Sequence, residues 1–306
     1  MMDRREFLKT AFNFSILTGV AMAAGNSITF GATAATAMPD LVAVKGGEPG
    51  AMFDVAVNAL GGMRKFVKKG QSVLVKPNIG WDVAPEYGAN TNPKLVYQII
   101  KSAFEAGAKK VSVFDHTCDS WEECYRNSGI EAAVKSAGGT MVPGNQKEYY
   151  RDVDVPGGVS LKKTKVHELL IDSDVFINVP VLKSHGSAGL TIAMKNLMGV
   201  VWDRSSWHAT NLHQRIADFA AYRKPDLTII DAYRVMISHG PKGIQSLDDV
   251  ANMGSLLASR DMVAADAAAA KLFGQMPKDV RYIKLAAEKG LGRMDIEKLN
   301  IKKIYL

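Results

Sequence analysis

The stretch that decides the fold is residues 172–199, DSDVFINVPVLKSHGSAGLTIAMKNLMG. Residues 175–182 form an apolar run that is short enough for a strand buried on both faces of a sheet. The small-residue loop 186–189 follows, and the apolar residues of 190–198 then recur at helical spacing. The pattern therefore predicts a buried strand, a polar loop and a helix that begins within that loop.

Lys183, Ser184 and His185 come at the carboxyl end of this predicted strand, directly before the glycine-rich loop. The first backbone N–H groups of a helix have no partner within the helix, and together with the helix dipole they favour a negative charge. A lysine and a histidine beside such groups would suit an anionic ligand. The alternative interpretation is a plain strand–turn–helix connection in which both residues are incidental.

The rest of the chain repeats this pattern of short apolar strands and helices. Strands are expected at residues 41–44, 72–75, 110–114, 140–142 and 226–230, with an edge strand at 301–306, and helices at 52–67, 92–106, 121–137, 213–221, 264–273 and 279–287. A helical region is also expected after the loop 238–243, and a hairpin at residues 153–166. Such alternation predicts an α/β fold, an open sandwich with a mostly parallel sheet and helices on both faces. We expect residues 38–306 to form one domain of this kind.

Length and composition are those of an ordinary globular protein. The chain has 306 residues, of which 47% are hydrophobic and 23% are charged, and this excludes collagen-like, disordered and disulfide-dense classes. The formal net charge is +7 and the isoelectric point is near 9.2, which favours anionic partners. The lysines and arginines are dispersed, and no basic run is interleaved with aromatic residues. We therefore expect no nucleic-acid partner.

The first 37 residues resemble an export signal. Arg4-Arg5-Glu6-Phe7-Leu8-Lys9 follows the twin-arginine pattern of two arginines, any residue and then Phe-Leu-Lys, although Asp3 stands where Ser or Thr is usual. Residues 11–24 are too polar and too few for a membrane span, and Ala35-Thr36-Ala37 offers a small-x-small cleavage site. The resemblance implies that the twin-arginine translocase delivers the protein to the periplasm and that residues 1–37 are its signal peptide. The alternative is an uncleaved anchor.

Ligands of open parallel sheets bind outside the carboxyl ends of the strands. Polar residues that could reach such a site follow four of the predicted buried strands: Lys76 and Asn78, Asp115 and His116, Lys183 and His185, and Asp231. Lys195 and Asn196, in the helix after the glycine-rich loop, and His239, in the loop 238–243, could line the same cleft. The alternative is that these residues are helix caps and ordinary polar loop residues.

The chain has two cysteines, Cys118 and Cys124. They cannot hold an iron–sulfur cluster by themselves, because such clusters need about four ligands. Their spacing is not Cys-x-x-Cys, so it does not indicate thioredoxin-like chemistry. In an exported protein they could form a disulfide, and the other interpretation is two free, partly buried thiols. His208 and His213 are five residues apart and therefore make a poor metal-binding pair on a helix. No cofactor is identified by these residues.

The order of short motifs along residues 40–275 resembles the domain of unknown function family 362 (DUF362). The motifs are Lys76-Pro77-Asn78, Thr91-Asn92-Pro93, Leu182-Lys183-Ser184-His185, Met194-Lys195-Asn196-Leu197-Met198-Gly199, Ile230-Asp231, His239-Gly240-Pro241 and Ala258-Ser259-Arg260-Asp261 with Val263-Ala264-Ala265-Asp266. Members of this family are often fused to ferredoxin-type iron–sulfur modules or carry twin-arginine signals. This chain has no ferredoxin cysteine cluster, so a built-in redox centre is not expected. The resemblance implies the fold and the location of the site, and it implies no reaction.

Two functions are consistent with these residues. In the first, an exported enzyme linked to redox metabolism binds an anionic small molecule or a metal-bound cofactor through Lys76, Asn78, Lys183, Lys195, Asn196 and His239. Its acid–base chemistry would come from His185 with Asp115 or Asp231. In the second, a non-catalytic accessory protein of a periplasmic redox or metal-handling system contacts a partner protein through the aromatic loop around Trp202 and Trp207. The sequence does not decide between an enzyme and a binding protein.

Overall fold

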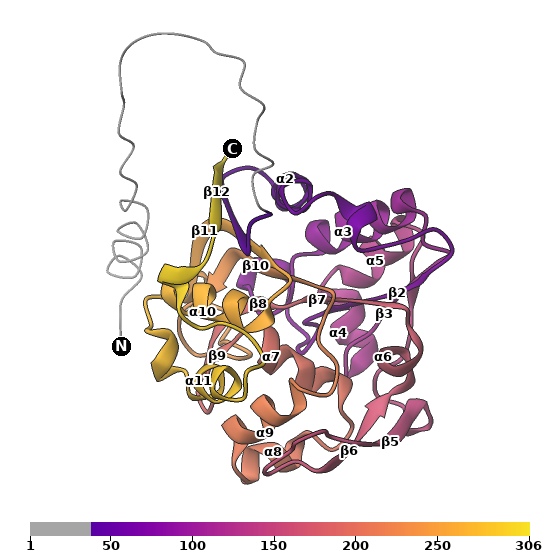
Figure 1. Ribbon diagram of the computed structural model, residues 1–306. Helices are drawn as coiled ribbons and strands as arrows, with labels where there is room; N and C mark the ends of the chain where they lie inside the picture. Colours follow the sequence, from indigo (N-terminus) through magenta and orange to yellow (C-terminus); the bar gives the residue numbers. More distant parts are fainter. Residues whose placement is uncertain (1–37) are drawn as a thin grey trace, which may run out of the picture.

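The computed structural model of the protein describes residues 38–306, and the predicted signal peptide, residues 1–37, lies outside this part of the chain. A ten-stranded sheet runs through the middle of the described residues (Figure 1). Eight of its strands follow one another in the order β12 (Ile301–Tyr305), β1 (Leu41–Lys45), β11 (Val250–Ser259), β10 (Leu227–Met236), β7 (Val175–Val179), β2 (Ser72–Pro77), β3 (Lys110–Val113) and β4 (Thr140–Met141). The remaining two are β8 (Val181–His185), which pairs with β10, and β9 (Gly189–Thr191), which pairs with β8.

Most neighbouring strands of this sheet are parallel. Parallel pairs join β10 to β7 and β8, β7 to β2, β2 to β3, β3 to β4 and β1 to β12. β11 is antiparallel to both β1 and β10, and β9 is antiparallel to β8. The predicted α/β class with a mostly parallel sheet is therefore confirmed, and β12 is an edge strand as expected.

Helices cover both faces of the sheet because successive strand residues point to opposite sides. Val73 and Val75 of β2 belong to one hydrophobic core, and Leu74 between them belongs to another. In Figure 1 the two groups of helices lie on either side of β2, β7 and β10. The first core contains α2 (Pro49–Ala59), α3 (Pro93–Ala106) and α5 (Ile130–Ser136), and the second contains α7 (Ala193–Asn196), α9 (Leu212–Phe219), α10 (Met262–Leu272) and α11 (Arg281–Glu288).

The order of the strands along the chain reverses at β2. From β2 the chain moves outward to β3 and β4, whereas β7 lies on the other side of β2. A crevice opens at such a point, outside the carboxyl ends of the strands on its two sides. The topology therefore brings the segments that follow β2, β3 and β7 to one place.

The helix predicted at residues 92–106 shows how local sequence sets an element. Asn92 is its N-cap, and its side-chain oxygen accepts a hydrogen bond of 3.0 Å from the backbone N–H of Lys94. Pro93 occupies the first turn, where a missing N–H costs little. Gly107 ends the helix with a φ of 109°, a left-handed conformation that a residue without a Cβ adopts readily. This prediction is confirmed.

Three predictions of helix were wrong in whole or in part. The helix expected at residues 52–67 ends at Ala59, because Gly61 and Gly62 follow with φ values of 95° and 83°. The single helix expected at residues 121–137 is divided into α4 (Trp121–Asn127) and α5, because Gly129 between them has a φ of 72°. The region after residue 243 was expected to be helical, but it forms the long strand β11, which pairs with β1 and β10 on its two sides. The pairing and burial of β11 between two strands stabilise a strand here, although the local sequence pattern favours a helix.

The stretch 172–199 also differs from its prediction. β7 ends at Val179, and after Pro180 the chain continues as β8, so Lys183 and His185 lie within a strand. The glycine-rich loop 186–188 is the turn of a β8–β9 hairpin. The helix α7 therefore begins at Ala193, after the hairpin, and the prediction that it begins within the loop was wrong.

The start of α7 is capped from another helix. Asp266 lies in the middle of α10, is fully buried, and accepts hydrogen bonds from the backbone N–H groups of Ala193 at 2.6 Å and Met194 at 3.0 Å. Burial raises the pKa of this carboxyl to about 7, although the two N–H donors act in the opposite direction. The backbone N–H groups at the start of this helix, which were predicted to bind an anionic ligand, are therefore already bound to the carboxyl group of Asp266.

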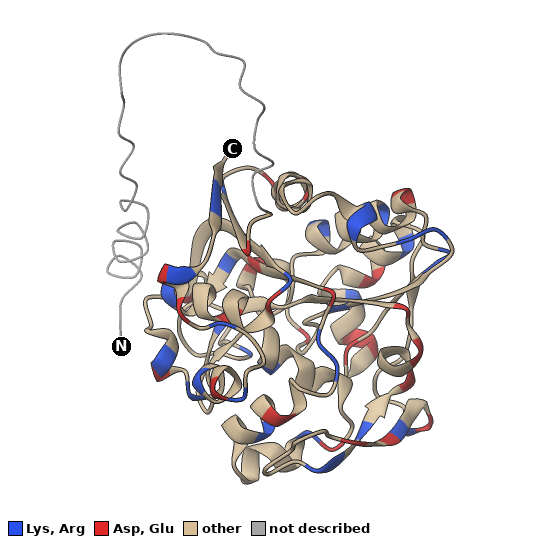
Figure 2. Ribbon diagram, in the orientation of Figure 1, with Lys and Arg blue, Asp and Glu red and all other residues tan. Residues whose placement is uncertain are grey.

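The remaining elements lie around these layers. β5 (Tyr150–Asp154) and β6 (Lys163–His167) form a separate two-stranded sheet, which confirms the predicted hairpin excursion. Two short helices, α6 (Glu168–Asp172) and α8 (Ser205–Ala209), precede β7 and α9 respectively. Figure 2 shows lysines and arginines interspersed with acidic residues over the described chain. None of the helices within residues 38–306 has the length and apolar character needed to cross a membrane.

Candidate functional site

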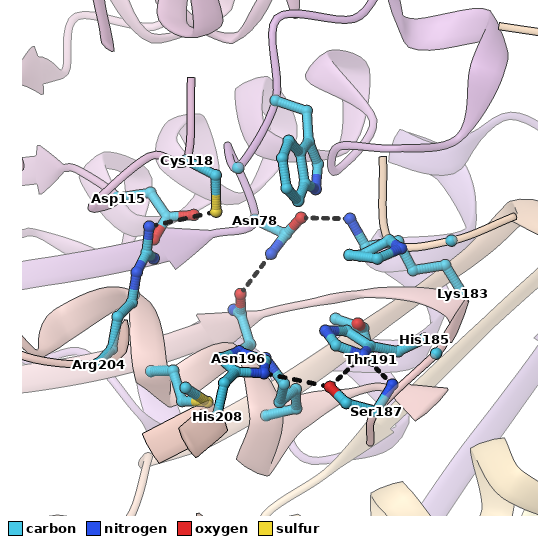
Figure 3. A pocket seen from close by; sticks show the side chains of 18 of the residues that line it. Asn78, Asp115, Cys118, Lys183, His185, Ser187, Thr191, Asn196, Arg204 and His208 are labelled. Atoms are coloured by element: carbon cyan, nitrogen blue, oxygen red, sulfur yellow. Dashed lines mark hydrogen bonds between the residues drawn. The ribbon is translucent and has the colours of Figure 1, made fainter. Parts of the chain in front are cut away.

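A cavity of about 340 Å³ lies at the point where the strand order reverses. Its lining comes from the ends of β2 and β3, the β8–β9 hairpin, the segment 191–208 and the turn at residues 240–241. Figure 3 shows side chains from these segments converging on one space. The structure brings together seven of the residues that the sequence singled out: Lys76, Asn78, Asp115, Lys183, His185, Lys195 and Asn196.

The floor of the pocket is a buried ion pair. The Nζ atom of Lys76 lies 2.8 Å from Oδ1 of Asp115, and both side chains are at most 2% exposed. Lys76 also donates to the side-chain oxygen of Asn196 at 2.8 Å. Burial lowers the pKa of Lys76, and the adjacent carboxylate of Asp115 opposes that shift. The second oxygen of Asp115 accepts the backbone N–H of Ile79 at 2.7 Å.

Gly199 makes room for this pair. A Cβ atom at residue 199 would lie 1.8 Å from Oδ1 of Asp115 and 2.6 Å from Nζ of Lys76. No side chain fits at these distances, so a glycine is required where the backbone passes over the pair. This explains a glycine of the Lys195–Gly199 motif by geometry.

Amide side chains connect the ion pair to the rest of the pocket. Asn196 donates to Oδ1 of Asn178 at 2.8 Å, and its own oxygen accepts from Lys76 and, at 3.2 Å, from Asn78. The oxygen of Asn78 accepts a hydrogen bond of 3.0 Å from Nζ of Lys183. Because an amide offers both donor and acceptor groups, this network holds the two lysines apart without adding charge.

Lys183 lines the pocket and is fully buried, with 1% of its surface exposed. Its ammonium group donates to Asn78 and, in a short contact, to the backbone oxygen of Ala89. Burial lowers its pKa to about 7, and the nearby charge of Lys195 acts in the same direction. No carboxylate in residues 38–306 forms a salt bridge with it.

Lys195 and Arg204 add two more cationic groups. In the described part of the chain, Nζ of Lys195 has no hydrogen-bond or salt-bridge partner, although it lines the pocket. Burial and the neighbouring guanidinium of Arg204 lower its pKa to about 8. Arg204 donates to the backbone oxygen of Thr117 at 2.6 Å and to the sulfur of Cys118 at 3.3 Å. The sequence gives no signal for Arg204, because this residue lies in an irregular segment with no motif around it.

His185 is held in one tautomer by the hairpin turn. Its Nδ1 atom accepts the backbone N–H groups of Ser187 and Ala188, each at 3.3 Å. Nε2 therefore carries the proton of the neutral ring. Burial, together with the charge of Lys195, lowers its pKa to about 2. The ring stacks on His208 with a centroid distance of 5.7 Å, and Ser187 lies within hydrogen-bond distance of both rings (Figure 3).

The structure places other predicted residues outside the pocket lining. Asp231 is buried and accepts the backbone N–H groups of Asn92 at 2.7 Å and Tyr233 at 3.0 Å, so it holds the start of α3 against β10. His239 pairs with Asp249 at 2.8 Å, and the residues after it, Gly240 and Pro241, reach the pocket instead.

The aromatic loop and the cysteines also have defined places. Trp207 is 1% exposed and packs on Phe219 in the core, so it is not part of a surface. Trp202 stacks on His116 with a centroid distance of 5.1 Å. Both cysteines are free thiols; Cys118 is exposed and lines the pocket, and Cys124 is buried.

The donor atoms of the pocket suit an anion better than a metal ion. Within residues 38–306, no three His, Cys, Asp or Glu side chains are grouped so that they could hold a metal ion. The pocket has one carboxylate, that of Asp115, which is already paired with Lys76. Ammonium, guanidinium and amide groups make up most of its polar lining, and these groups bind carboxylates and phosphates.

Comparisons with known proteins agree with the sequence motifs. A family model described as "Domain of unknown function (DUF362)" matches residues 73–271. A thylakoid-associated protein of Synechocystis sp. is 30% identical over 215 residues, which cover 68% of this chain and 64% of that protein's length.

Two solved structures match part of this chain at low identity. The lactate racemase apoprotein from Thermoanaerobacterium thermosaccharolyticum matches 72% of this chain and 54% of its own, with 13% identity and a TM-score of 0.44. A structural-genomics protein from Thermotoga maritima matches 79% of this chain and 60% of its own, with 12% identity and a TM-score of 0.43.

Proposed function

The chain belongs to the DUF362 family, and from this premise we propose that its pocket binds a small, multiply charged anion. The observation that carries the proposal is the excess of positive groups at one buried place. Lys183, Lys195 and Arg204 line the cavity, and no salt bridge within the described residues neutralises any of them. Asp115 is committed to Lys76.

The free energy of this arrangement favours an anionic ligand. Burying a charge without a counter-charge is costly, and the cost appears here as the lowered pKa values of Lys183 and Lys195. An anion in the pocket would supply the missing counter-charge and stabilise the protonated forms of both lysines. Di- or tricarboxylates and phosphates are the chemical classes that match three cations in a cavity of about 340 Å³.

We expect Lys183→Met to lower the affinity for malate and for inorganic phosphate by about tenfold or more, because it removes a buried cation. Isothermal titration calorimetry at low and at high salt measures the effect. Salt should weaken binding to the unaltered protein, and the difference between the two proteins should shrink at high salt. Lys302→Met, which removes an exposed lysine of β12, is the matched control and should bind like the unaltered protein. Equal affinities for the Lys183 variant and the control would refute the proposal.

The same titrations should depend on pH. Lys183 and Lys195 have lowered pKa values of about 7 and about 8 in the free protein, so an anion must draw protons onto them when it binds near neutral pH. Affinity is therefore highest below pH 7 and falls as pH rises through these values. The affinity for the anion should fall by about tenfold or more from pH 7 to pH 9. Titration in two buffers of different ionisation enthalpy measures the number of protons exchanged on binding, and we expect uptake and not release.

Whether the pocket also performs a reaction is a separate matter. His185 uses Nδ1 to accept two backbone N–H groups, and its lowered pKa makes it a poor proton acceptor. We propose that it acts as a neutral hydrogen-bond donor through Nε2. The alternative of a non-catalytic binding protein draws support from the fact that neither His185 nor Asp115, which is paired with Lys76, is free to act as a general base. Native mass spectrometry of the protein as purified tests for a bound ligand, because a co-purified anion would identify the ligand class.

We also propose that the protein is exported to the periplasm by the twin-arginine translocase. The support is Arg4-Arg5 with the Ala35-Thr36-Ala37 segment, in the part of the sequence outside the described residues. The Arg4→Lys/Arg5→Lys variant should leave full-length protein in the cytoplasm of a bacterial host. Cell fractionation and immunoblotting measure this, with Arg64→Lys, at an exposed position of the domain, as the control. Periplasmic delivery of the double variant in a host without a functional twin-arginine translocase would contradict the proposal.

A further inference from the structure

The three lysines of the pocket differ in what their amine nitrogens contact. We propose that Lys195 is a nucleophile that forms an imine with the carbonyl group of a small oxo acid held in this pocket. The inference rests on the proposed anion site and narrows its ligand to molecules that carry both a carboxylate and a ketone or aldehyde. It is carried by the geometry of the three amines.

Lys76 and Lys183 are both fixed by acceptors. Lys76 lies 2.8 Å from Asp115 and donates to Asn196. These two acceptors stabilise the protonated amine, and its N–H groups are directed at them and not at a ligand. Lys183 donates to Asn78 and to Ala89. Either amine would have to break these buried hydrogen bonds before it could attack a carbonyl carbon.

Lys195 has no such commitment. Its Nζ atom lines the cavity, and no hydrogen bond or ion pair to it occurs within residues 38–306. Its backbone is held on both sides, because Asp266 fixes Met194 and the amide network fixes Asn196. A free amine on a fixed piece of backbone is the arrangement that attack on a bound carbonyl requires.

The surroundings increase the fraction of this amine that is neutral and therefore reactive. Imine formation needs an unprotonated amine, and a buried lysine beside other cations loses its proton more easily than one in water. Burial and the charges of Arg204 and Lys76 lower the pKa of Lys195 to about 8. A measurable fraction of Lys195 is therefore neutral near pH 7, whereas an exposed lysine is almost fully protonated.

Other pocket residues could hold the rest of an oxo acid. Lys183 and Arg204 remain available to pair with its carboxylate groups. The hydroxyl of Thr191 lines the cavity, is buried, and has no hydrogen-bond partner in the described chain, so it can donate to the carbonyl oxygen. His185 offers a second donor at Nε2.

The step balances without any further reactant. The amine lone pair of Lys195 forms a C–N bond with the carbonyl carbon, and the π electrons of the C=O bond move to its oxygen. That oxygen takes up a proton, and the nitrogen loses one, which gives a carbinolamine. Loss of the hydroxyl with one more proton as water then leaves the C=N bond. No atom changes its oxidation state, so no oxidant or reductant is involved.

Reductive trapping tests the inference on the full chain. 2-Oxoglutarate is the probe, sodium borohydride supplies the hydride that converts an imine to a stable secondary amine, and peptide mapping by mass spectrometry locates the adduct. We expect a saturable adduct on Lys195. It should be absent from Lys195→Met and from Lys195→Arg, and unchanged in Lys302→Met. The initial rate at pH 6.5 should be about tenfold lower than at pH 8, because protonation removes the neutral amine.

A matched ligand separates the failure of this inference from the failure of the anion site. 2-Hydroxyglutarate carries the same carboxylates without a carbonyl, so it should bind and compete but give no adduct. Binding of both ligands with no trapped adduct would overturn the imine and leave the anion site intact. Adducts spread over surface lysines and equal in Lys195→Arg would also overturn it. Binding of neither 2-oxoglutarate, 2-hydroxyglutarate nor phosphate would overturn both.

Discussion

Replacing Asp115 by Asn is expected to lower the free energy of unfolding by about 3–5 kcal/mol. The side chain keeps its size and can still accept the N–H of Ile79, but it no longer neutralises Lys76. Lys76 has no exposed surface, so the variant leaves an uncompensated charge in the interior. Removal of one partner from a buried ion pair is among the most destabilising single changes known in proteins.

Denaturant unfolding followed by circular dichroism measures this change. Glu48→Gln is the matched control, because it removes an ion pair with Lys94 in which the two side chains are 63% and 72% exposed. That control should alter stability by less than about 1 kcal/mol. If Asp115→Asn also changed stability by so little, Lys76 would have to be neutral in the folded variant, and a buried charge at Lys76 would not be what Asp115 compensates.

Replacing Lys195 by Met is expected to have the opposite effect and to stabilise the ligand-free protein by about 1–3 kcal/mol near neutral pH. Lys195 is partly buried, and its pKa is lowered to about 8 because its charged form is unfavourable where it lies. Methionine keeps an unbranched apolar side chain and removes the charge. A residue that destabilises its own fold and lines a pocket is typical of a functional site.

The pH dependence of this gain gives the test. The folded-state pKa of Lys195 lies below that of the unfolded chain, so between about pH 8 and pH 10 the unfolded state binds more protons. The stability of the unaltered protein therefore rises with pH over this range, and the difference in stability between it and Lys195→Met becomes smaller. Thermal unfolding of both proteins at pH 6.5, 8 and 10 measures this difference. A variant that is less stable than the parent at pH 6.5 would show that Lys195 serves the fold rather than a ligand.

The general fold could be predicted from the sequence because its signals are local. Buried parallel strands give apolar runs, and Asn92, Pro93 and Gly107 mark the ends of α3 by side-chain chemistry that acts within a few residues. The β8–β9 hairpin could not be predicted in this way. Residues 190–198 have helical spacing, but the first of them pair with β8, and this pairing depends on contacts outside the stretch.

The location of the site could also be predicted, although its chemistry could not. Strand ends collect around one crevice in such sheets, and this rule brought Lys76, Asp115 and Lys183 together. Which lysine is paired and which is free depends on distances that no motif encodes. The sequence shows Asp266 as a carboxylate inside a helix, and only the fold shows that it caps α7. Arg204 reaches the pocket from a segment without periodicity.

The place of β1 in the sheet has a consequence for how the protein is made. Leu41 is paired on one side with Ser259 and on the other with Ile301, so the first strand of the domain lies between two strands that are synthesised much later. A ribosome releases the chain from the amino end, and loops of this length close slowly. Neither edge of β1 can therefore pair with its partner strand until translation of the domain is almost complete. Nascent chains should depend on chaperones during this interval, because exposed strand edges are sites of aggregation.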